Sequence, residues 1–332
     1  MPALEVRDLK THFFVERGVV KAVDGVDFDV QRGETVGLAG ESGCGKTTTA
    51  YSVMRLVPEP GRIVGGEIYL DGTNVVPLPE KGMRELRWKR VAMVFQGAMN
   101  ALNPVLKISD QITEGILIHD DVDEDVALRR ARTLFKEVGL EPERIDNYPH
   151  EFSGGMRQRA MIAMALVNNP EFLILDEPTT ALDVTMQAQI IEVIRKIQRE
   201  YEMSLLFITH DLSVLAETCE RIVIMYAGKI MESGDTAELF TEPIHPYSKG
   251  LVAAIPTVER GKSRRLFSIP GNPPDLIAPP KGCPFHVRCV YAQDICSAEI
   301  PAETIPDRGF VACHFSSELR KVSPTQFWLE RE

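Results

Sequence analysis

No stretch of this 332-residue sequence is apolar over the roughly 18–20 residues that a membrane-spanning helix needs, because its apolar runs are only as long as strands. The first ten residues, MPALEVRDLK, also lack the apolar core of a secretory signal. Basic side chains are in deficit too, with 37 Lys and Arg against 48 Asp and Glu, for a net charge of -11. We therefore expect a cytosolic chain that is not built around a long nucleic-acid groove.

The remaining composition is that of a soluble globular protein, with 44% hydrophobic and 26% charged residues. Disorder, collagen and coiled coil are excluded as descriptions of the whole chain, and the length allows about two domains. The six cysteines of a cytosolic chain favour metal or redox use over a disulfide framework.

Strand-like and helix-like patterns alternate along the first 240 residues, which predicts a mostly parallel sheet covered on both faces. Helical spacing predicts helices over Lys46–Leu56 and Val184–Tyr201, and a helical insertion from about residue 108 to 167. After Phe240 prolines become dense, which indicates a loop-rich C-terminal module. The predicted strands are Leu4–Val6, Val19–Val23, Val26–Val30, Thr35–Ala39, Glu67–Leu70, Val91–Phe95, Phe172–Leu175 and Leu205–Ile208.

A glycine-rich segment, G-E-S-G-C-G-K-T from 40 to 47, fits the phosphate-loop pattern G-x-x-x-x-G-K-[ST] between a strand and a helix. Its backbone N–H groups and the helix N-terminus suit phosphate, Lys46 suits the β- and γ-phosphates, and the Thr47 hydroxyl suits Mg²⁺. A glycine-rich turn with an incidental lysine would match by chance in about one chain per hundred. We predict nucleotide binding by Gly40, Glu41, Ser42, Gly43, Cys44, Gly45, Lys46, Thr47 and Thr48.

Two acids end the apolar run F-L-I-L-D-E at 172–177. A carboxylate at this place beside a phosphate loop orders Mg²⁺, which suits Asp176. The next acid, Glu177, suits a general base that polarises the attacking water. Without the phosphate loop, the two acids would be read as solvated residues at a strand end.

A second glycine-rich segment, F-S-G-G-M-R-Q at 152–158, precedes a helical pattern. Ser153 is a favourable N-cap, and Gly154 and Gly155 allow the backbone to approach an anion closely. The segment resembles the L-S-G-G-Q signature of ABC ATPases, with Phe for Leu and Met for the last Gln. The other interpretation is a polar loop that caps a helix.

Four further positions match the ABC ATPase family in order, and the resemblance implies their roles. Gln96 matches the Q-loop glutamine, which senses the nucleotide, contacts the transporter and joins the Mg²⁺ site. Asp183 matches the D-loop, and His210 matches the switch histidine that contacts the γ-phosphate. Phe13 is the candidate for stacking on adenine, with Phe14 as its neighbouring alternative.

The same resemblance implies the fold and the partners. The expected fold class is α/β, a P-loop NTPase core with antiparallel β elements, a helical subdomain and a small loop-rich C-terminal module that contains cysteines. We expect the core at 1–96 and 169–240, the helical subdomain at 97–168 and the C-terminal module at 241–332. Each motif occurs once, so a second ABC ATPase subunit, identical or homologous, is expected in a head-to-tail dimer.

Three later stretches narrow the resemblance to the ATPases of oligopeptide/dipeptide importers. They are L-N-P-V at 102–105, H-P-Y at 245–247, and P-G-N-P-P at 270–274 leading into G-C-P-F-H-V-R-C at 282–289. Such a subunit lies on the cytoplasmic face of the membrane, pairs with two permease subunits and serves an extracytoplasmic solute-binding protein indirectly. We expect the surface around Asn100–Leu106 to dock on the permeases.

Other functions stay open at this point. A soluble ABC ATPase acting on nucleic acid or ribosomes is the main alternative, and a metal-sensing regulatory protein is a weaker one. Oligosaccharide and nickel are alternative cargoes for the importer.

Four late cysteines, Cys283, Cys289, Cys296 and Cys313, follow the spacing C-x5-C-x6-C-x16-C. Four thiolates are able to staple a small region that has little apolar material of its own. Structural zinc normally uses closer pairs, whereas iron–sulfur clusters accept varied spacings. The importer resemblance includes a cysteine motif of this kind with a [4Fe–4S] cluster, so we predict that cluster, with Zn²⁺ or unmetallated thiols as alternatives.

Overall fold

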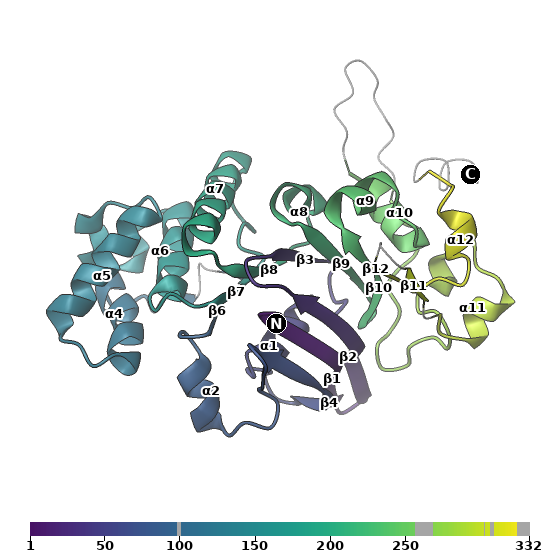
Figure 1. Cartoon of the computed structure of the whole chain (residues 1–332), viewed down its shortest axis with the longest axis horizontal. Coiled ribbons are helices and arrows are strands. Elements are labelled where there is room, and N and C mark those ends of the chain that lie inside the picture. The colour runs from purple at the N-terminus through teal and green to yellow at the C-terminus, as the bar shows by residue number, and fades with distance from the viewer. Residues whose placement is uncertain (98–100, 256–267, 302, 306–308, 324–332) are drawn as a thin grey trace, which may run out of the picture.

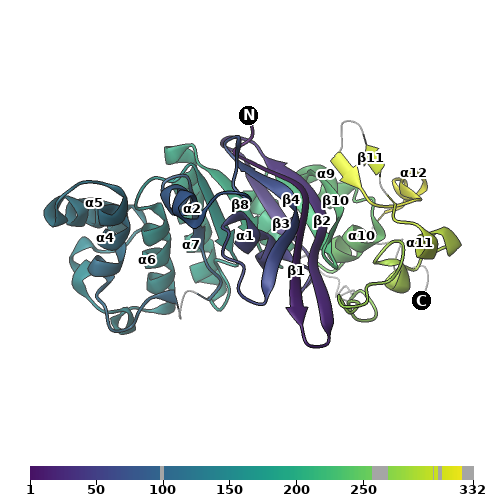
Figure 2. The same ribbon diagram turned by 90° about the horizontal axis from the view of Figure 1, so that it is seen from below.

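The computed structural model describes residues 1–97, 101–255, 268–301, 303–305 and 309–323. Two sheets form the body of the molecule, with a group of helices at one end and the C-terminal elements at the other (Figures 1 and 2). None of the helices among these residues is long and apolar enough to cross a membrane.

The N-terminal sheet is antiparallel and has four strands in the order β2-β1-β4-β5. Its first two strands are longer than predicted, because register shifts interrupt the alternation of apolar residues while the pairing continues past them. The strands are β1 (Leu4–Val15), β2 (Gly18–Val30), β4 (Gly61–Leu70) and β5 (Thr73–Asn74).

The central sheet has eight strands in the order β11-β12-β10-β9-β3-β8-β7-β6. The five strands from β9 to β6 are parallel, and β10, β12 and β11 continue the sheet in antiparallel fashion. The predicted α/β fold with mixed sheets is therefore confirmed. The strands are β3 (Thr35–Ala39), β6 (Val91–Val94), β7 (Phe172–Asp176), β8 (Ser204–Ile208), β9 (Arg221–Tyr226), β10 (Lys229–Asp235), β11 (Glu303–Ile305) and β12 (Gly309–Val311).

Both faces of the central sheet are covered, as β7 shows. Leu173 and Leu175 point into one hydrophobic cluster, and Phe172 and Ile174 point into the other. The second cluster lies against the N-terminal sheet and α1 (Lys46–Val53). The first is covered mainly by α7 (Val184–Tyr201), whose bounds are those predicted, and by α8 (Leu212–Thr218). The shorter helices are α2 (Glu80–Leu86) and α9 (Thr236–Thr241).

The helical segment lies between β6 and β7 in the sequence and forms one end of the molecule (Figure 1). Three α-helices of its described residues pack on one another, and buried residues such as Ile112, Phe135 and Ile162 fill the space between them. The helices are α4 (Ile108–His119), α5 (Glu124–Glu137) and α6 (Gly154–Leu166), with short 3₁₀ turns at Pro142–Asp146 and Pro149–Glu151.

The C-terminal elements lie at the opposite end of the central sheet (Figure 2). Strand β12 pairs with β10, so this part of the chain extends the sheet. Its helices are α10 (Pro246–Ala253), the 3₁₀ turn His286–Arg288, α11 (Asp294–Ala298) and α12 (Ser316–Leu319).

Candidate nucleotide-binding and hydrolysis site

The predicted site residues follow the carboxyl ends of neighbouring parallel strands. The phosphate loop follows β3, and Gln96 comes after β6. Asp176 is the last residue of β7, Glu177 follows it, and His210 comes after β8. Because parallel strands end at the same edge of a sheet, these side chains share one edge, which is where open α/β sheets bind ligands.

The phosphate loop requires its glycines. A Cβ atom on Gly40 would lie 2.2 Å from the Met225 carbonyl oxygen, and one on Gly45 would lie 2.3 Å from the Ala22 carbonyl oxygen. Gly45 precedes α1 with a φ of 109° and provides no side-chain cap, so the first N–H groups of α1 are available to an anion. The Lys46 ammonium group donates to the Gly40 and Glu41 carbonyl oxygens at 2.7 and 3.0 Å.

The Mg²⁺ ligands predicted from the sequence fit a metal ion. The Thr47 hydroxyl donates to Asp176 Oδ1 at 3.2 Å, and the Asp176 carboxylate is fully buried. The second oxygen, Oδ2, has no hydrogen-bond partner among the described residues. Burial raises the pKa of Asp176 to about 6 against the opposing effect of Thr47. A buried carboxylate with an unsatisfied oxygen suits a cation, and Mg²⁺ typically takes only one or two carboxylates from a protein.

Three side chains surround the predicted general base. Gln96 Nε2 donates to Glu177 Oε2 at 2.8 Å, Thr180 Oγ1 donates to the same oxygen at 2.9 Å, and His210 Nδ1 lies 3.2 Å from Oε1. Burial alone would raise the pKa of Glu177, but the bonds from His210 and Thr180 outweigh it and lower the pKa below its usual value. Glu177 also has a φ of 47°, a strained conformation of the kind found at functional sites.

The two candidate aromatic residues are placed differently. The Phe13 ring covers Gly61, where a Cβ atom would lie 2.5 Å from the ring. The Phe14 ring is partly exposed and carries the Arg62 guanidinium group 4.1 Å from its centroid. Stacking of Phe13 on adenine stays a prediction.

The second glycine-rich segment lies on the helical segment, where Ser153 caps α6 and accepts from the Met156 N–H at 3.4 Å. Asp183 likewise caps α7 and accepts from the Met186 N–H at 3.0 Å. Among the described residues, no hydrogen bond joins Ser153, Gly154 or Gly155 to the phosphate loop. The structure thus brings the phosphate loop and the residues around Glu177 together. It leaves the second glycine-rich segment, Ser153 to Gly155, which we call the signature segment, apart from them.

Sequence reasoning missed three residues that contact this site. Thr180 bonds Glu177, the Tyr247 hydroxyl accepts from the Glu41 N–H at 2.8 Å, and Arg288 forms an ion pair with the Glu41 side chain. Thr180 was within reach of a motif search, since it lies three residues after Glu177. The other two come from the C-terminal part of the chain, and no local pattern connects them with the phosphate loop.

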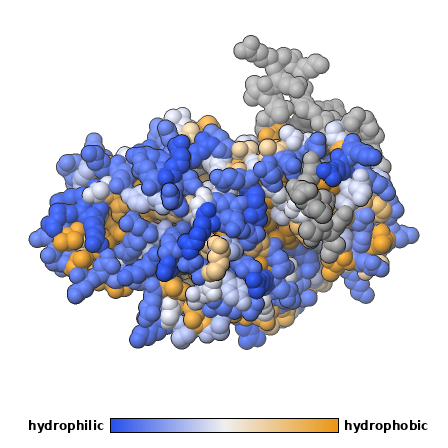
Figure 3. All heavy atoms as spheres, in the orientation of Figure 1, coloured by the Kyte–Doolittle hydropathy of each residue, from blue (hydrophilic) through white to orange (hydrophobic). Residues whose placement is uncertain are grey.

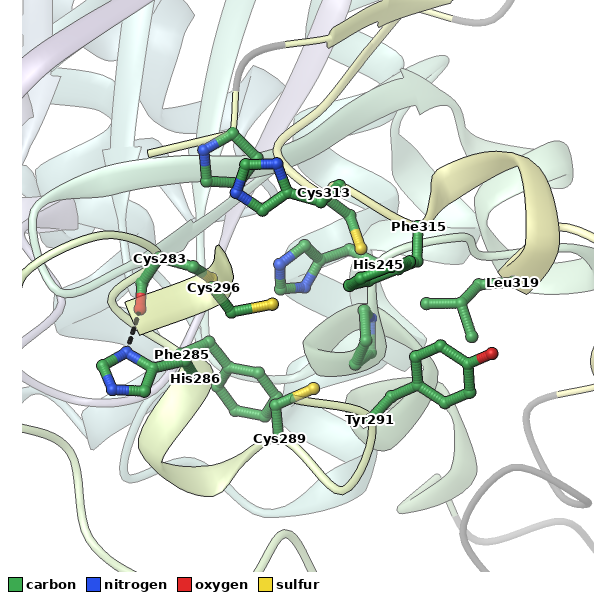
Figure 4. A pocket seen from close by; sticks show the side chains of 13 residues that line it. His245, Cys283, Phe285, His286, Cys289, Tyr291, Cys296, Cys313, Phe315 and Leu319 are labelled. Carbon is green, nitrogen blue, oxygen red and sulfur yellow. Dashed lines mark hydrogen bonds between the residues drawn. The ribbon is translucent and has the colours of Figure 1, made fainter. Parts of the chain in front are cut away.

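The predicted [4Fe–4S] cluster and its zinc alternative are wrong. The four cysteines line a pocket with His245, His286 and His314, but its cavity measures only about 20 Å³ (Figure 4). Among the described residues, no group of three or more His, Cys, Asp or Glu side chains is arranged to hold a metal ion. Burial raises the pKa of Cys283 to about 11 and that of Cys313 to about 12, which favours thiols over the thiolates that metals bind.

The physical reason for the error is that this part of the chain does not depend on its own small core. Rings of Tyr226 on β9, Tyr247 on α10 and Phe285 pack with centroids 4.8 to 5.3 Å apart. The Ala312 N–H also donates to the Met231 carbonyl oxygen at 2.7 Å, beside the β10–β12 pairing. Sheet pairing and aromatic packing therefore hold this region where the sequence suggested a metal.

Two family models match the chain. The ABC transporter model matches residues 23–180, and the model for the C-terminal region of oligopeptide/dipeptide transporters matches residues 231–296. Among solved structures, the ATP-binding cassette MJ0796, in a dimeric post-hydrolysis state bound to ADP and Pi, superposes with a TM-score of 0.64 at 26% identity, covering 70% of this chain and 98% of that one.

Curated relatives match over most of their length. A probable peptide ABC transporter ATP-binding protein, y4tR of Sinorhizobium fredii, is 48% identical over 95% of this chain and 96% of its own length. The oligopeptide transport ATP-binding protein OppD of Bacillus subtilis is 47% identical over 93% of this chain and 87% of its own length. These relatives do not favour the alternatives of a nucleic-acid or ribosome ATPase. The chain belongs to the family of ABC transporter ATP-binding proteins that includes the oligopeptide and dipeptide transport subunits.

Proposed function

We propose that this chain hydrolyses ATP to energise the import of peptides through a membrane ABC transporter. The observation that carries the proposal is the arrangement of Lys46, Thr47, Asp176 and Glu177 at one edge of the central sheet. The relatives named for peptide transport support the cargo class, and their match extends through the C-terminal region.

The chemistry assigned to each residue follows from its position. Lys46 and the N–H groups at the start of α1 bind the phosphates, while Thr47 and Asp176 hold Mg²⁺, with Gln96 as a further proposed ligand. Bound Mg²⁺ neutralises charge on the phosphates and orients their oxygens. Glu177 stays ionised at neutral pH because its pKa is low, and its carboxylate accepts the proton of the attacking water.

Glu177 has room for a water on one of its two oxygens. Gln96 and Thr180 both donate to Oε2, whereas His210 is the one described side chain hydrogen-bonded to Oε1, so Oε1 retains a lone pair that can accept from an attacking water. We propose that Gln96 and His210 turn toward the γ-phosphate and the metal when nucleotide binds. Gln96 lies two residues after the end of β6, and the helical segment follows it in the sequence, so the proposed movement of Gln96 would be passed to the helices.

We further propose a head-to-tail dimer with a second ABC ATPase subunit. The signature segment from Ser153 to Gly155 is a helix N-terminus, and within the described part of the chain no hydrogen bond joins it to the phosphate loop. The dimeric state of the related cassette supports such a pairing. Whether the second subunit is identical or homologous does not alter the chemistry.

The proposed docking surface for two permease subunits lies on the helical segment. Val105 and Ile118 are 75% and 63% exposed, and Leu106 and Leu117 are partly exposed nearby in the sequence. Figure 3 shows hydrophobic areas at that end of a mostly hydrophilic face. Asn100, the first residue of the predicted docking stretch, lies outside the described residues. Docking there would hold the chain peripherally at the cytoplasmic membrane face, with the solute-binding protein engaged only through the permeases.

We also propose the division into a core (1–96 and 169–240), a helical subdomain (97–168) and a loop-rich, cysteine-containing C-terminal module (241–332). The position of α4, α5 and α6 between β6 and β7 supports the first boundaries. The last boundary falls at the end of α9, at Thr241, and the described helices that follow are eight residues long or shorter.

The test uses the full chain assembled with its permeases and partner ATPase in vesicles. Peptide uptake should require ATP and Mg²⁺, and Glu177→Gln, with the partner ATPase also inactivated, should stop uptake while ATP still binds. Full turnover by that assembly would contradict the assignment. ATP-dependent uptake of an oligosaccharide or nickel, with none of peptides, would overturn the cargo and leave the ATPase standing.

A further inference from the structure

The phosphate loop carries an acidic side chain that the C-terminal part of the chain neutralises. Glu41 directly follows Gly40, and Arg288 donates to both of its carboxylate oxygens at 2.7 and 2.9 Å. The Tyr247 hydroxyl accepts from the Glu41 backbone N–H at 2.8 Å. One loop residue is therefore held at its side chain and at its backbone by groups from two different C-terminal segments.

Arg288 is itself fixed in place, which makes the contact with Glu41 specific. Its side chain is only 5% exposed, and its Nε donates to the Pro270 carbonyl oxygen at 2.9 Å. Its Nη1 also donates to the Tyr226 hydroxyl at 3.2 Å, and its guanidinium group lies 5.6 Å from the centre of the Tyr226 ring. A buried, bidentate guanidinium group with this many partners has one available orientation.

The position of Glu41 explains why its charge matters. The Glu41 carbonyl oxygen accepts from the Lys46 ammonium group, so the residue belongs to the loop that wraps the phosphates. A carboxylate without a partner at this place would repel the triphosphate, and a partly buried site screens that repulsion poorly. Arg288 cancels the charge and fixes the loop residue that bears it.

We propose that Arg288 is a positioning residue for nucleotide binding, through which the C-terminal region sets the affinity of the phosphate loop for MgATP. The proposal rests on ATP binding at this loop and is independent of the cargo. It differs from a purely structural role, because the loss caused by removing Arg288 should depend on the charge of Glu41.

The experiment measures equilibrium binding of MgATP, and kcat and KM for hydrolysis, with the full-length chain. Arg288→Gln should raise the Kd roughly tenfold, as expected for the loss of a buried charge-assisted hydrogen-bond pair. KM should rise in parallel while kcat changes less. Arg288→Lys, which keeps the charge but not the bidentate geometry, should lie between the wild type and Arg288→Gln.

The deciding variant is the double substitution Glu41→Gln with Arg288→Gln. It should recover most of the lost affinity, because no uncompensated carboxylate is left in the loop. The matched control is Arg221→Gln, which breaks partly buried ion pairs with Asp29 and Glu34 away from the loop and should leave the Kd within about twofold of wild type. Thermal melting of each variant checks that it is folded.

The outcomes separate the hypotheses. Wild-type affinity in Arg288→Gln, or a double variant as weak as the single one, would overturn the positioning role and leave ATP binding intact. If Arg288→Gln fails to fold, the same comparison is made with Arg288→Lys alone and combined with Glu41→Gln. A wild-type chain that does not bind MgATP would instead overturn the proposed function itself.

Discussion

Two helices of this chain begin at glycine-rich loops, and the two beginnings differ. At α1, Gly45 provides no cap, and Lys46 is buried over the loop that precedes the helix. At α6, Ser153 provides a cap, the loop carries no lysine, and the hydrogen bond to the Met156 N–H is long at 3.4 Å. The acidic residues of the proposed hydrolysis site, Asp176 and Glu177, lie near the start of α1 and not near the start of α6.

The comparison indicates that the two loops have different roles in ATP hydrolysis. The α1 loop has a cation, a hydroxyl and a buried carboxylate within the same chain, so it is equipped to bind a nucleotide by itself. The α6 loop offers only N–H groups and a hydroxyl, so it suits an anion that a second chain brings. Substitutions at the two loops should therefore separate binding from hydrolysis.

The largest expected effect on nucleotide affinity is at the first loop. Lys46→Ala should weaken MgATP binding by about 100-fold or more, because the buried ammonium group is the side-chain cation of the phosphate loop. Equilibrium titration of the full chain measures the effect. Lys229→Ala is the control, since that ammonium group donates to the Asp24 carbonyl oxygen and not to a residue of the loop. Equal loss in both variants would remove the special role of Lys46.

The next effect separates chemistry from binding at the same edge of the sheet. Glu177→Gln should lower kcat by a factor of roughly 10²–10⁴, because the amide cannot accept the proton of water. The Kd for MgATP should stay near its wild-type value, and light scattering should show more ATP-dependent dimer. Thr180→Ala, which removes one hydrogen bond from Glu177, should have a much smaller effect on kcat. A normal rate in Glu177→Gln would exclude it as the base.

A third variant tests the second loop alone. Ser153→Ala should reduce hydrolysis about tenfold while MgATP affinity stays within about twofold of wild type, because the loop completes a site on another chain. Asp123→Ala is the matched control, since Asp123 caps α5 in the same helical segment. It should leave the rate unchanged. A large loss of affinity in Ser153→Ala would place the signature segment in the nucleotide site of its own chain.

The smallest effect concerns the caps themselves. Asp123 Oδ1 accepts from the Val126 N–H at 2.7 Å, whereas the Ser153 bond is 3.4 Å long. Asp123→Ala should lower the free energy of unfolding by about 1 kcal/mol, and Ser153→Ala should lower it by less. Urea unfolding monitored by circular dichroism measures both. A larger loss for Ser153→Ala would mean that its cap is mainly structural.

The sequence predicts the parts of this molecule that depend on local patterns. Strands β7 and β8 and the phosphate loop were each predicted from patterns of fewer than ten residues, and helical spacing predicted α7 with the bounds that it has in the structure. The long hairpin of β1 and β2 was predicted only in parts, because bulges break the alternation that marks a strand. The strands β11 and β12 are only three residues long and depend on pairing with β10.

The site shows the same division between local and distant information. The phosphate loop and the acids Asp176 and Glu177 were predicted from local patterns, and Gln96 and His210 from the family resemblance. Arg288, however, lies 247 positions from Glu41, and no spacing rule connects them. The prediction of a metal cluster at the four late cysteines was wrong for a related reason. Their pattern suggested a region in need of a metal, whereas Tyr226 and β10 of the central sheet supply its packing.

The connection between β6 and β7 has a mechanical consequence. The two strands are parallel neighbours, so the chain leaves β6 at the nucleotide edge, beside Gln96, and returns to β7 at the opposite edge. That return is anchored, because Arg90 pairs with Glu171 and the Phe172 N–H donates to the Arg90 carbonyl oxygen at 3.0 Å. The helical segment is therefore held at its return to β7 and connected to the nucleotide edge through Gln96. A displacement of Gln96 would rotate the segment about the held end, while the strands of the sheet keep their pairing.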